Sequence, residues 1–367
     1  MYSKLRSLWG LIMANYISFK PNDFFKSKLY TGNGSTTHGI TGVGFQPDFT
    51  WMKKRNAADS HVLIDAVRGV TKYIEVDTAD AEATDAQSLK SFDADGFTLG
   101  NAGRVNNNTN PFVSYSWKLG TTSVPSGGSI TPTAVNYSAA QGMGIYKWSG
   151  TAGTGTIAHG LGQAPTYFWV KELSGGGTTN WYTGGNLLSD GDYQMYLNLD
   201  SGQGSAGSAL WQSNFPSSTL MYLGTDGDVN GSGKTYVMYV FAPINGFSSF
   251  GNYKGNGNAN GPYIQCGFKP AYVIIKRING IKNWMLYDNK RWYSNTNTTD
   301  FQNTCFAFEM NNGGAGFASA SDIDLNSQGF KIRTGGGLVN ESGDNYIYFA
   351  FADQPTAFNN GDAATAR

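Results

Sequence analysis

The strongest constraint on the fold of this chain is a threefold internal repeat. The sequence Gly-Phe-Gln-Pro at residues 44–47 recurs as Gly-Phe-Lys-Pro at 267–270 and, in a looser form, at 160–165. After each proline comes an aromatic residue two positions on and a lysine six positions on, and these lysines are Lys53, Lys171 and Lys276. The repeats are spaced about 105–118 residues apart. Each unit is therefore a small domain and not one turn of a solenoid.

The end of each unit predicts a β-strand. Large apolar residues alternate over residues 112–117, 236–241 and 346–351, and this period of two is typical of a half-buried strand. Asn-Gly pairs at 33–34 and 256–257 supply the positive φ angles of tight hairpins. The sequence thus predicts an all-β protein of three tandem antiparallel β-sandwich, jelly-roll-like repeats with six to eight short strands each. A short helix over residues 78–89, which are rich in Ala, Asp and Glu, remains an alternative for that stretch.

The closing strands set the expected boundaries. We expect an N-terminal arm at 1–22, β repeat 1 at 23–120, a linker of low hydrophobicity at 121–135, β repeat 2 at 136–246, β repeat 3 at 247–354 and a C-terminal tail at 355–367. Only residues 243–246 join the second and third repeats. This short connection predicts that these two repeats pack as a rigid pair.

Charge and the length of apolar runs argue against two classes of partner. The chain has 26 basic and 26 acidic side chains among 367 residues, and only 14% of its residues are charged. Nucleic acid is not an expected partner because there is no excess of cations to replace counterions. Membrane insertion is not expected either, since no run approaches the length of a membrane helix. The two cysteines, Cys266 and Cys305, are too few for a disulfide framework, and whether they pair is left open.

Few residues suggest catalysis. The three histidines, His38, His61 and His159, are not accompanied by a nucleophile elbow, a phosphate loop or a zinc motif. Carboxylate pairs could in principle cleave a glycan with two acids. Their spacing of two residues at strand ends fits turn positions better, so no catalytic residue and no cofactor is predicted. The pairs are Asp93 and Asp95, Asp226 and Asp228, and Asp322 and Asp324.

One string resembles part of a calcium loop. Asp226, Asp228 and Asn230 place oxygen ligands at alternate positions, with Gly227 and Gly231 between and after them. The twelfth position holds Val237 instead of a glutamate. The Val-Asn pair also recurs at 105–106 and 339–340 without acids at the same offsets. We therefore interpret Asn230 as a turn residue that binds nearby backbone, and keep these three residues only as metal candidates.

The repeated lysines and the loop aromatics are the remaining candidates. Lys53, Lys171 and Lys276 are expected to end edge-exposed strands and protect them from pairing, with contact to phosphate or to sialic-type carboxylates as the alternative. Exposed loop aromatics are expected to bind carbohydrate, although subunit packing would use the same residues. These aromatics are Trp181, Tyr182, Trp211, Trp292 and Tyr293.

Several strings together resemble a known kind of protein. They are Tyr-Thr-Gly-Asn-Gly at 30–34, Thr-Gly-Val-Gly-Phe-Gln-Pro-Asp-Phe at 41–49, residues 91–100 and residues 345–352. The chain resembles a repeat-containing virion structural, tail-fibre-like protein of tailed bacteriophages, especially marine ones, over nearly all of residues 16–354.

The resemblance implies a non-enzymatic virion part. A tail fibre or appendage that recognises a host-surface glycan is the first expectation, located on the virion, in contact with other virion proteins and assembled as a homo-oligomer, with a trimer as the guess. A capsid decoration protein is the alternative within the same class. A glycan depolymerase is the alternative from a different class.

Overall fold

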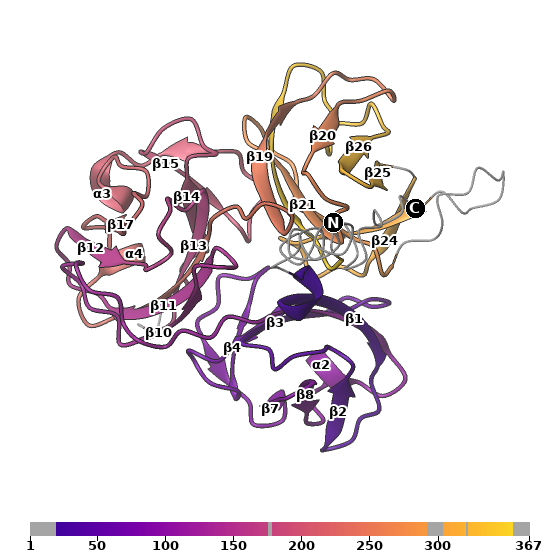
Figure 1. Ribbon diagram of the computed structural model, residues 1–367, viewed down its shortest axis with the longest axis horizontal. Helices are drawn as coiled ribbons and strands as arrows, with labels where there is room; N and C mark the ends of the chain where they lie inside the picture. The colour runs from indigo at the N-terminus through magenta and orange to yellow at the C-terminus, as the bar shows by residue number, and fades with distance from the viewer. Residues whose placement is uncertain (1–19, 175–177, 292–303, 321, 355–367) are drawn as a thin grey trace, which may run out of the picture.

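The prediction of an all-β sandwich fold is confirmed by the structure. The computed structural model describes residues 20–174, 178–291, 304–320 and 322–354. Strands β1 to β9 form repeat 1, β10 to β18 form repeat 2 and β19 to β27 form repeat 3, and the three repeats surround a common centre (Figure 1). Each repeat has nine strands within the described residues, more than the six to eight expected. The expected C-terminal tail and all but the last three residues of the expected N-terminal arm lie outside these ranges.

Repeat 1 stacks a large antiparallel sheet on a small one. A short 3-10 helix, η1 (Pro21–Asp23), precedes it, and α2 (Gly103–Asn106) leads into its last strand. The large sheet has the order β1 (Phe25–Thr31), β9 (Pro111–Trp117), β3 (Phe49–Lys54), β4 (Val62–Asp65), β5 (Lys72–Glu75) and β6 (Ala83–Thr84). The small sheet has the order β2 (His38–Thr41), β8 (Gly96–Leu99) and β7 (Leu89–Asp93).

Repeat 2 has the same plan with one added strand and a smaller second sheet. Its short helices are α3 (Ser208–Trp211) and α4 (Gly227–Asn230). The large sheet has the order β10 (Ala134–Ser138), β11 (Met143–Ser149), β18 (Thr235–Phe241), β13 (Tyr167–Glu172), β14 (Tyr182–Gly185), β15 (Tyr193–Tyr196) and β16 (Gly204–Ser205). The small sheet pairs β12 (Gly155–Ala158) with β17 (Leu220–Leu223).

Repeat 3 returns to the plan of repeat 1. The large sheet has the order β19 (Ser248–Lys254), β27 (Asn345–Phe351), β21 (Tyr272–Arg277), β22 (Met285–Asp288), β23 (Thr304–Glu309) and β24 (Phe317–Ala320). The small sheet has the order β20 (Tyr263–Gln265), β26 (Gly329–Ile332) and β25 (Ile323–Asn326).

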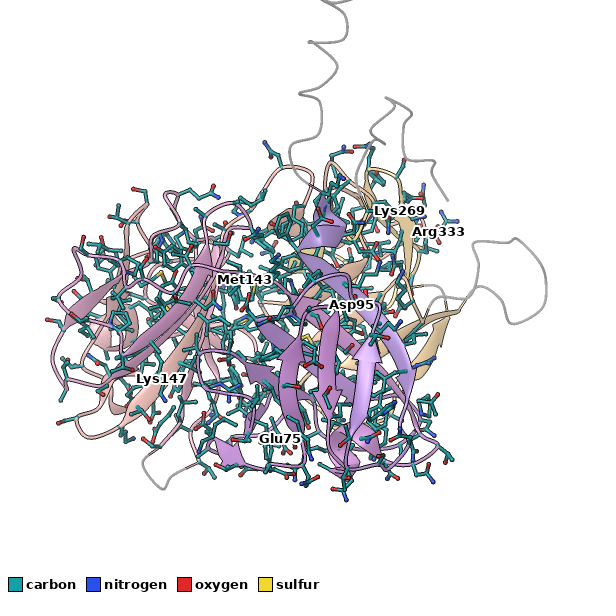
Figure 2. All side chains as sticks on the ribbon, turned by 60° about the horizontal axis from the view of Figure 1, so that its bottom comes forward. Glu75, Asp95, Met143, Lys147, Lys269 and Arg333 are labelled. Atoms are coloured by element: carbon teal, nitrogen blue, oxygen red, sulfur yellow. The ribbon has the colours of Figure 1, made fainter. Side chains whose placement is uncertain are left out.

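The closing strands β9, β18 and β27 are buried on both faces, so the expectation of half-buried strands is wrong. In β18, Val237, Tyr239 and Phe241 point into one core, while Tyr236 and Met238 point into another. The first core is shared by all three large sheets, and the second belongs to repeat 2 and its small sheet. The three repeats are therefore one packed unit, since each large sheet has a face in the same core. Figure 2 shows Met143, another residue of the shared core, where repeat 2 meets repeat 1.

Glycine is required where the first long strand of each repeat ends. A Cβ atom on Gly32 would lie 2.2 Å from the carbonyl oxygen of Asn107. The equivalent glycines, Gly150 and Gly255, would meet the carbonyl oxygens of Gly231 and Glu341 at 2.0 and 2.2 Å. The backbone thus approaches the turn before the closing strand too closely for any other residue.

Two further segments differ from their expected form. Residues 78–89 form no helix, because Asp85 accepts a hydrogen bond from the amide of Gln87 and folds the chain into a turn. In the segment expected to be a linker, Ile130 is buried in the core of repeat 2 and its amide donates to the carbonyl of Thr156. This segment is therefore packed against repeat 2.

No helix among the described residues is both long and apolar enough to cross a membrane.

Candidate functional site

The predicted ligand-binding aromatics do not form an exposed surface. Trp181, Tyr182 and Trp211 are 0%, 8% and 1% exposed, so the expectation of exposed aromatics is wrong for these three. Trp181 packs in the shared core, and the other two pack in the core of repeat 2. These large side chains are buried because the cores on both faces of the large sheet need large apolar groups to fill them. Trp292 and Tyr293 lie outside the described residues.

The three metal candidates point to different partners. Asp226 caps α4 by accepting a hydrogen bond from the amide of Asp228 at 2.8 Å. Asp228 accepts from the hydroxyl of Tyr182 at 2.6 Å. Asn230 is buried and donates from its amide to the carbonyl oxygens of Gly153 and Gly224. Among the described residues no group of three or more His, Cys, Asp or Glu side chains is arranged to hold a metal ion.

The remaining acidic pairs also diverge. Asp95 accepts from the amides of Gly42 and Gly44, and these two bonds lower its pKa. Asp93 accepts from the hydroxyl of Thr98. In the other pair, the buried Asp322 accepts from Tyr287, while Asp324 forms an ion pair with Arg333 on the surface.

Two of the histidines form hydrogen bonds with residues of nearby turns. His38 lies 2.8 Å from the side-chain oxygen of Asn106. His159 accepts from the amide of Leu161 and lies 3.1 Å from the carbonyl oxygen of Ser217. Burial lowers the pKa of His159.

The repeated lysines join the repeats, so the expectation that they end edge-exposed strands is wrong. They lie on β3, β13 and β21, which are interior strands, and they are buried. Lys53 of repeat 1 donates to the carbonyl of Gly313 in repeat 3, and Lys171 of repeat 2 donates to that of Ala79 in repeat 1. Lys276 of repeat 3 donates to the backbone carbonyl of Asp200 in repeat 2. The distances are 3.1, 3.0 and 2.9 Å, and the three contacts run in the same direction around a closed ring.

Each lysine also donates to a carbonyl of its own repeat. The acceptors are Asp59, Thr179 and Lys282. Burial lowers the pKa of Lys53 and Lys171 to about 8 and that of Lys276 to about 7. The lysines therefore hold two backbone segments together at each junction, as buried donors must find acceptors.

A buried ion pair and a tyrosine reinforce two of the three junctions. Arg68 Nε donates to Asp65 Oδ2 over 2.6 Å in repeat 1, and the hydroxyl of Tyr239 from repeat 2 donates to the same oxygen over 2.6 Å. Between repeats 3 and 1, Arg291 pairs with Asp288, which accepts from the hydroxyl of Tyr115 over 2.6 Å. Such charges are tolerated in a core only when they are paired and hydrogen-bonded.

At the third junction, between repeats 2 and 3, apolar residues and a glycine occupy the positions of all three polar residues. Gly185, Leu188 and Phe349 occupy the places of the aspartate, the arginine and the tyrosine. Phe349 of repeat 3 packs 4.9 Å from the ring of Tyr167 in repeat 2. The three positions thus change together, because any one polar residue alone would be buried without a partner.

His61 marks the junction between repeat 3 and repeat 1. At the other two junctions a tryptophan occupies this place, and Trp181 and Trp284 donate to the carbonyls of Glu75 and Tyr196. His61 instead accepts from Trp51 Nε1 over 3.0 Å, and its ring packs edge-on 5.4 Å from that of Phe308 in repeat 3. Burial, with the charges of Lys53 and Arg291, lowers its pKa well below the usual value.

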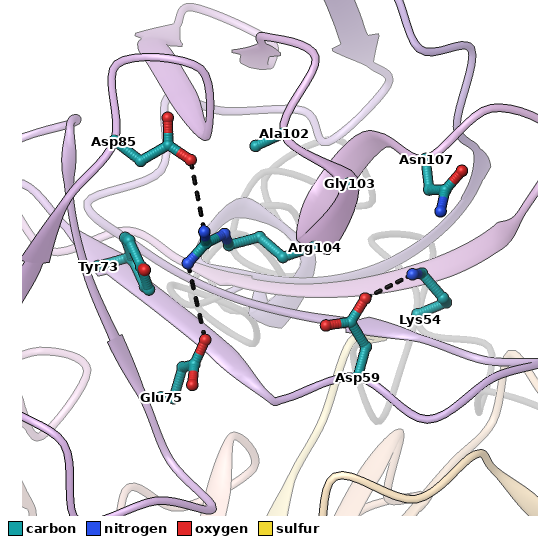
Figure 3. A pocket seen from close by; sticks show the side chains of 9 residues that line it. All are labelled: Lys54, Asp59, Tyr73, Glu75, Asp85, Ala102, Gly103, Arg104 and Asn107. Atoms are coloured by element: carbon teal, nitrogen blue, oxygen red, sulfur yellow. Dashed lines mark hydrogen bonds and ion pairs between the residues drawn. The ribbon is translucent and has the colours of Figure 1, made fainter.

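The candidate binding site is a charged recess on repeat 1. It has a volume of about 530 Å³ and is drawn in Figure 3. Arg104 extends from α2 between Glu75 and Asp85, with 3.7 Å to each carboxylate, and lies 4.0 Å over the ring of Tyr73. The recess is lined by Lys54, Asp59, Tyr73, Glu75, Asp85, Ala102, Gly103, Arg104 and Asn107.

Neighbouring repeats fix the walls of this recess. The carbonyl of Glu75 accepts from Trp181 of repeat 2, and the amide of Asp59 donates to Gly313 of repeat 3 over 2.8 Å. Partial burial raises the pKa of the Glu75 carboxyl. The recess is therefore pre-formed by the assembly of the three repeats, although its lining comes from repeat 1 alone.

This site was not predicted from the sequence, although the repeats carry a signal for it. Arg104 has Asp228 and Leu338 as its equivalents in repeats 2 and 3. Lys54 likewise corresponds to Glu172 and Arg277. These positions differ within an otherwise matching framework, so a repeat-by-repeat comparison would have separated them from the structural positions.

A family model described as Domain of unknown function (DUF7483) matches residues 20–355. No curated protein matches the chain.

Proposed function

The chain belongs to the family described as Domain of unknown function (DUF7483), and we propose that it is a non-enzymatic structural protein of a phage virion. In this proposal the protein is a tail fibre or similar appendage and takes part in recognition of the host surface. It contacts other virion proteins and associates with copies of itself, with a trimer as the expectation.

The observation that carries the proposal is the closed ring of contacts between the repeats. The buried lysines each join two repeats, and the Asp-Arg-Tyr clusters do the same at two junctions. Groups with strongly shifted pKa values often indicate catalytic sites, but they also occur in structural networks. Here the shifted lysines bind backbone carbonyls, which supports a rigid scaffold with loops as its variable parts.

The resemblance of the four strings to phage tail-fibre-like proteins supports the location on a virion. Residues 30–34 run from the end of β1 into the turn after it, and residues 345–352 cover the whole of β27, and both carry part of that resemblance. They are framework residues, so these two strings concern the scaffold and do not indicate the ligand.

Mass spectrometry of separated heads and tails, with cryo-electron microscopy of intact particles, tests this proposal. We expect the chain in the tail fraction and its density on an appendage. Abundance in the head fraction, with density over the capsid lattice, would favour decoration of the capsid. Absence from particles, or release of products from host polysaccharide by the purified protein, would overturn the proposal.

A further inference from the structure

We propose that the charged recess of repeat 1 binds an uncharged sugar, and this inference rests on the proposed role in host-surface recognition. The ligand class follows from the way in which the charged side chains of the recess are spaced.

The ion pairs around Arg104 leave hydrogen-bonding capacity unused. The guanidinium lies 3.7 Å from Glu75 and 3.7 Å from Asp85, which is longer than a hydrogen bond. The stack on Tyr73 holds the guanidinium plane in position. Asp85 already accepts from the amide of Gln87 and the hydroxyl of Ser88, and Glu75 from Ser60, but each carboxylate oxygen has a further lone pair. The N–H donors and these lone pairs can therefore bind a third group, and a hydroxyl can accept from one and donate to the other.

The near balance of charge gives an ionised ligand little net attraction. Lys54 and Arg104 face three carboxylates, those of Asp59, Glu75 and Asp85. A small anion would be repelled by all three carboxylates, and a small cation would be repelled by both basic groups. Neighbouring hydroxyls of a neutral sugar avoid both costs, because each hydroxyl can use a donor and an acceptor of the recess together.

The site is specific to repeat 1. In repeats 2 and 3 the equivalents of Lys54 form ion pairs with the residue before the closing strand, Glu172 with Lys234 and Arg277 with Asp344. Asn110 occupies this place in repeat 1, and Lys54 pairs with Asp59 inside the recess instead. The framework is thus the same in each repeat, whereas in repeat 1 the charges of Lys54 and Arg104 are directed towards one recess.

Saturation-transfer NMR on the full chain tests the inference. The probes are the methyl glycosides of glucose, galactose, mannose and N-acetylglucosamine at millimolar concentration, with N-acetylneuraminic acid as the anionic probe and putrescine as the cationic one. The variant Arg104→Leu imports the residue that repeat 3 carries at this position, Leu338, so the fold should accommodate it. Asp85→Asn is a second variant that keeps the oxygen bound to the amide of Gln87.

Arg333→Ala is the matched control, because Arg333 pairs with Asp324 on the surface of repeat 3. Figure 2 shows this arginine far from Glu75 of the recess. We expect at least one neutral glycoside to bind, Arg104→Leu to weaken it by about tenfold or more, and the control to bind as the parent does. Binding by none of the neutral glycosides, or binding unchanged in both recess variants, would overturn the inference. Preference of the recess for either charged probe would overturn the charge argument.

The two proposals fail in different ways. A protein found on tails that binds none of the neutral glycosides would refute the sugar site and leave the virion role. A protein absent from particles that binds a glycoside through Arg104 would refute the virion role and leave the site.

Discussion

Lys171 Nζ of repeat 2 donates a hydrogen bond to the carbonyl oxygen of Ala79 in repeat 1 over 3.0 Å. The same contact occurs at the other two junctions of the molecule, with Lys53 and Lys276 as donors. The acceptor, Ala79, lies four residues after Glu75, whose carbonyl accepts a hydrogen bond from Trp181 of the same neighbouring repeat. A repeat encoded in tandem thus acts as three subunits of a ring within one chain.

Removing one lysine should destabilise the whole chain. Lys171→Met keeps the aliphatic length but leaves the carbonyls of Ala79 and Thr179 without their buried donor. We expect the free energy of unfolding to fall by about 1–3 kcal/mol. Urea denaturation followed by tryptophan fluorescence measures it. Lys147→Met, a partly exposed lysine of the same repeat, is the control and should change little; an equal loss in both variants would refute the structural role.

The lysines should also make stability depend on pH. Their pKa is about 7 to 8 in the folded chain, whereas an unfolded lysine holds its proton to about pH 10.4. Between about pH 7 and 10 the unfolded state therefore binds more protons, so the free energy of unfolding should rise with pH. Above about pH 10 it should fall again, because burial raises the pKa of Tyr115 and Tyr239. Lys276→Met should lose part of the rise measured between pH 7 and 9.5, and an unchanged rise would contradict this assignment.

Acid should weaken the junction between repeats 3 and 1. Because the pKa of His61 is lowered in the folded chain, the unfolded state takes up a proton first as the pH falls below about 6.5. The stability that depends on neutral His61 is then lost as the pH falls. His61→Trp imports the residue of the other two junctions and should flatten the fall in melting temperature between pH 7 and 5. His159 titrates in both proteins, so some fall should remain; identical pH profiles would count against a role for His61.

The polar clusters should be replaceable only as a set. Arg68→Leu alone leaves Asp65 buried without its cation and should cost about 3–5 kcal/mol in unfolding free energy. The triple variant Asp65→Gly, Arg68→Leu and Tyr239→Phe reproduces the apolar junction of Gly185, Leu188 and Phe349. It should be more stable than the single variant when both are unfolded in urea. A triple variant less stable than Arg68→Leu would show that the residues do not act as a unit.

The sequence predicted the strands well because period-two patterns and turn residues act locally. The strands β9, β18 and β27 were visible in this way. The burial of both faces was readable in principle, since residues 236–241 are apolar at every position. The role of Lys171 was not readable. Its acceptors are backbone carbonyls, and Ala79 has no side chain that marks it as a partner.

The recess of repeat 1 was missed for a related reason. Arg104 and Tyr73 are 31 residues apart and come together only when α2 packs near β5. The aromatic residues selected instead, such as Trp181, are large apolar groups whose burial depends on a core made by three repeats. Exposure therefore could not be judged from one repeat alone.

The central claim is that the three repeats unfold as one unit, and native-state hydrogen exchange measured by mass spectrometry tests it most directly. The amides of β9, β18 and β27 should exchange with the same free energy of opening, since the three strands share one core. In Lys171→Met that free energy should fall by the same amount in all three strands. A loss of protection confined to β18 and its neighbours in repeat 2 would show three independent domains and contradict the account.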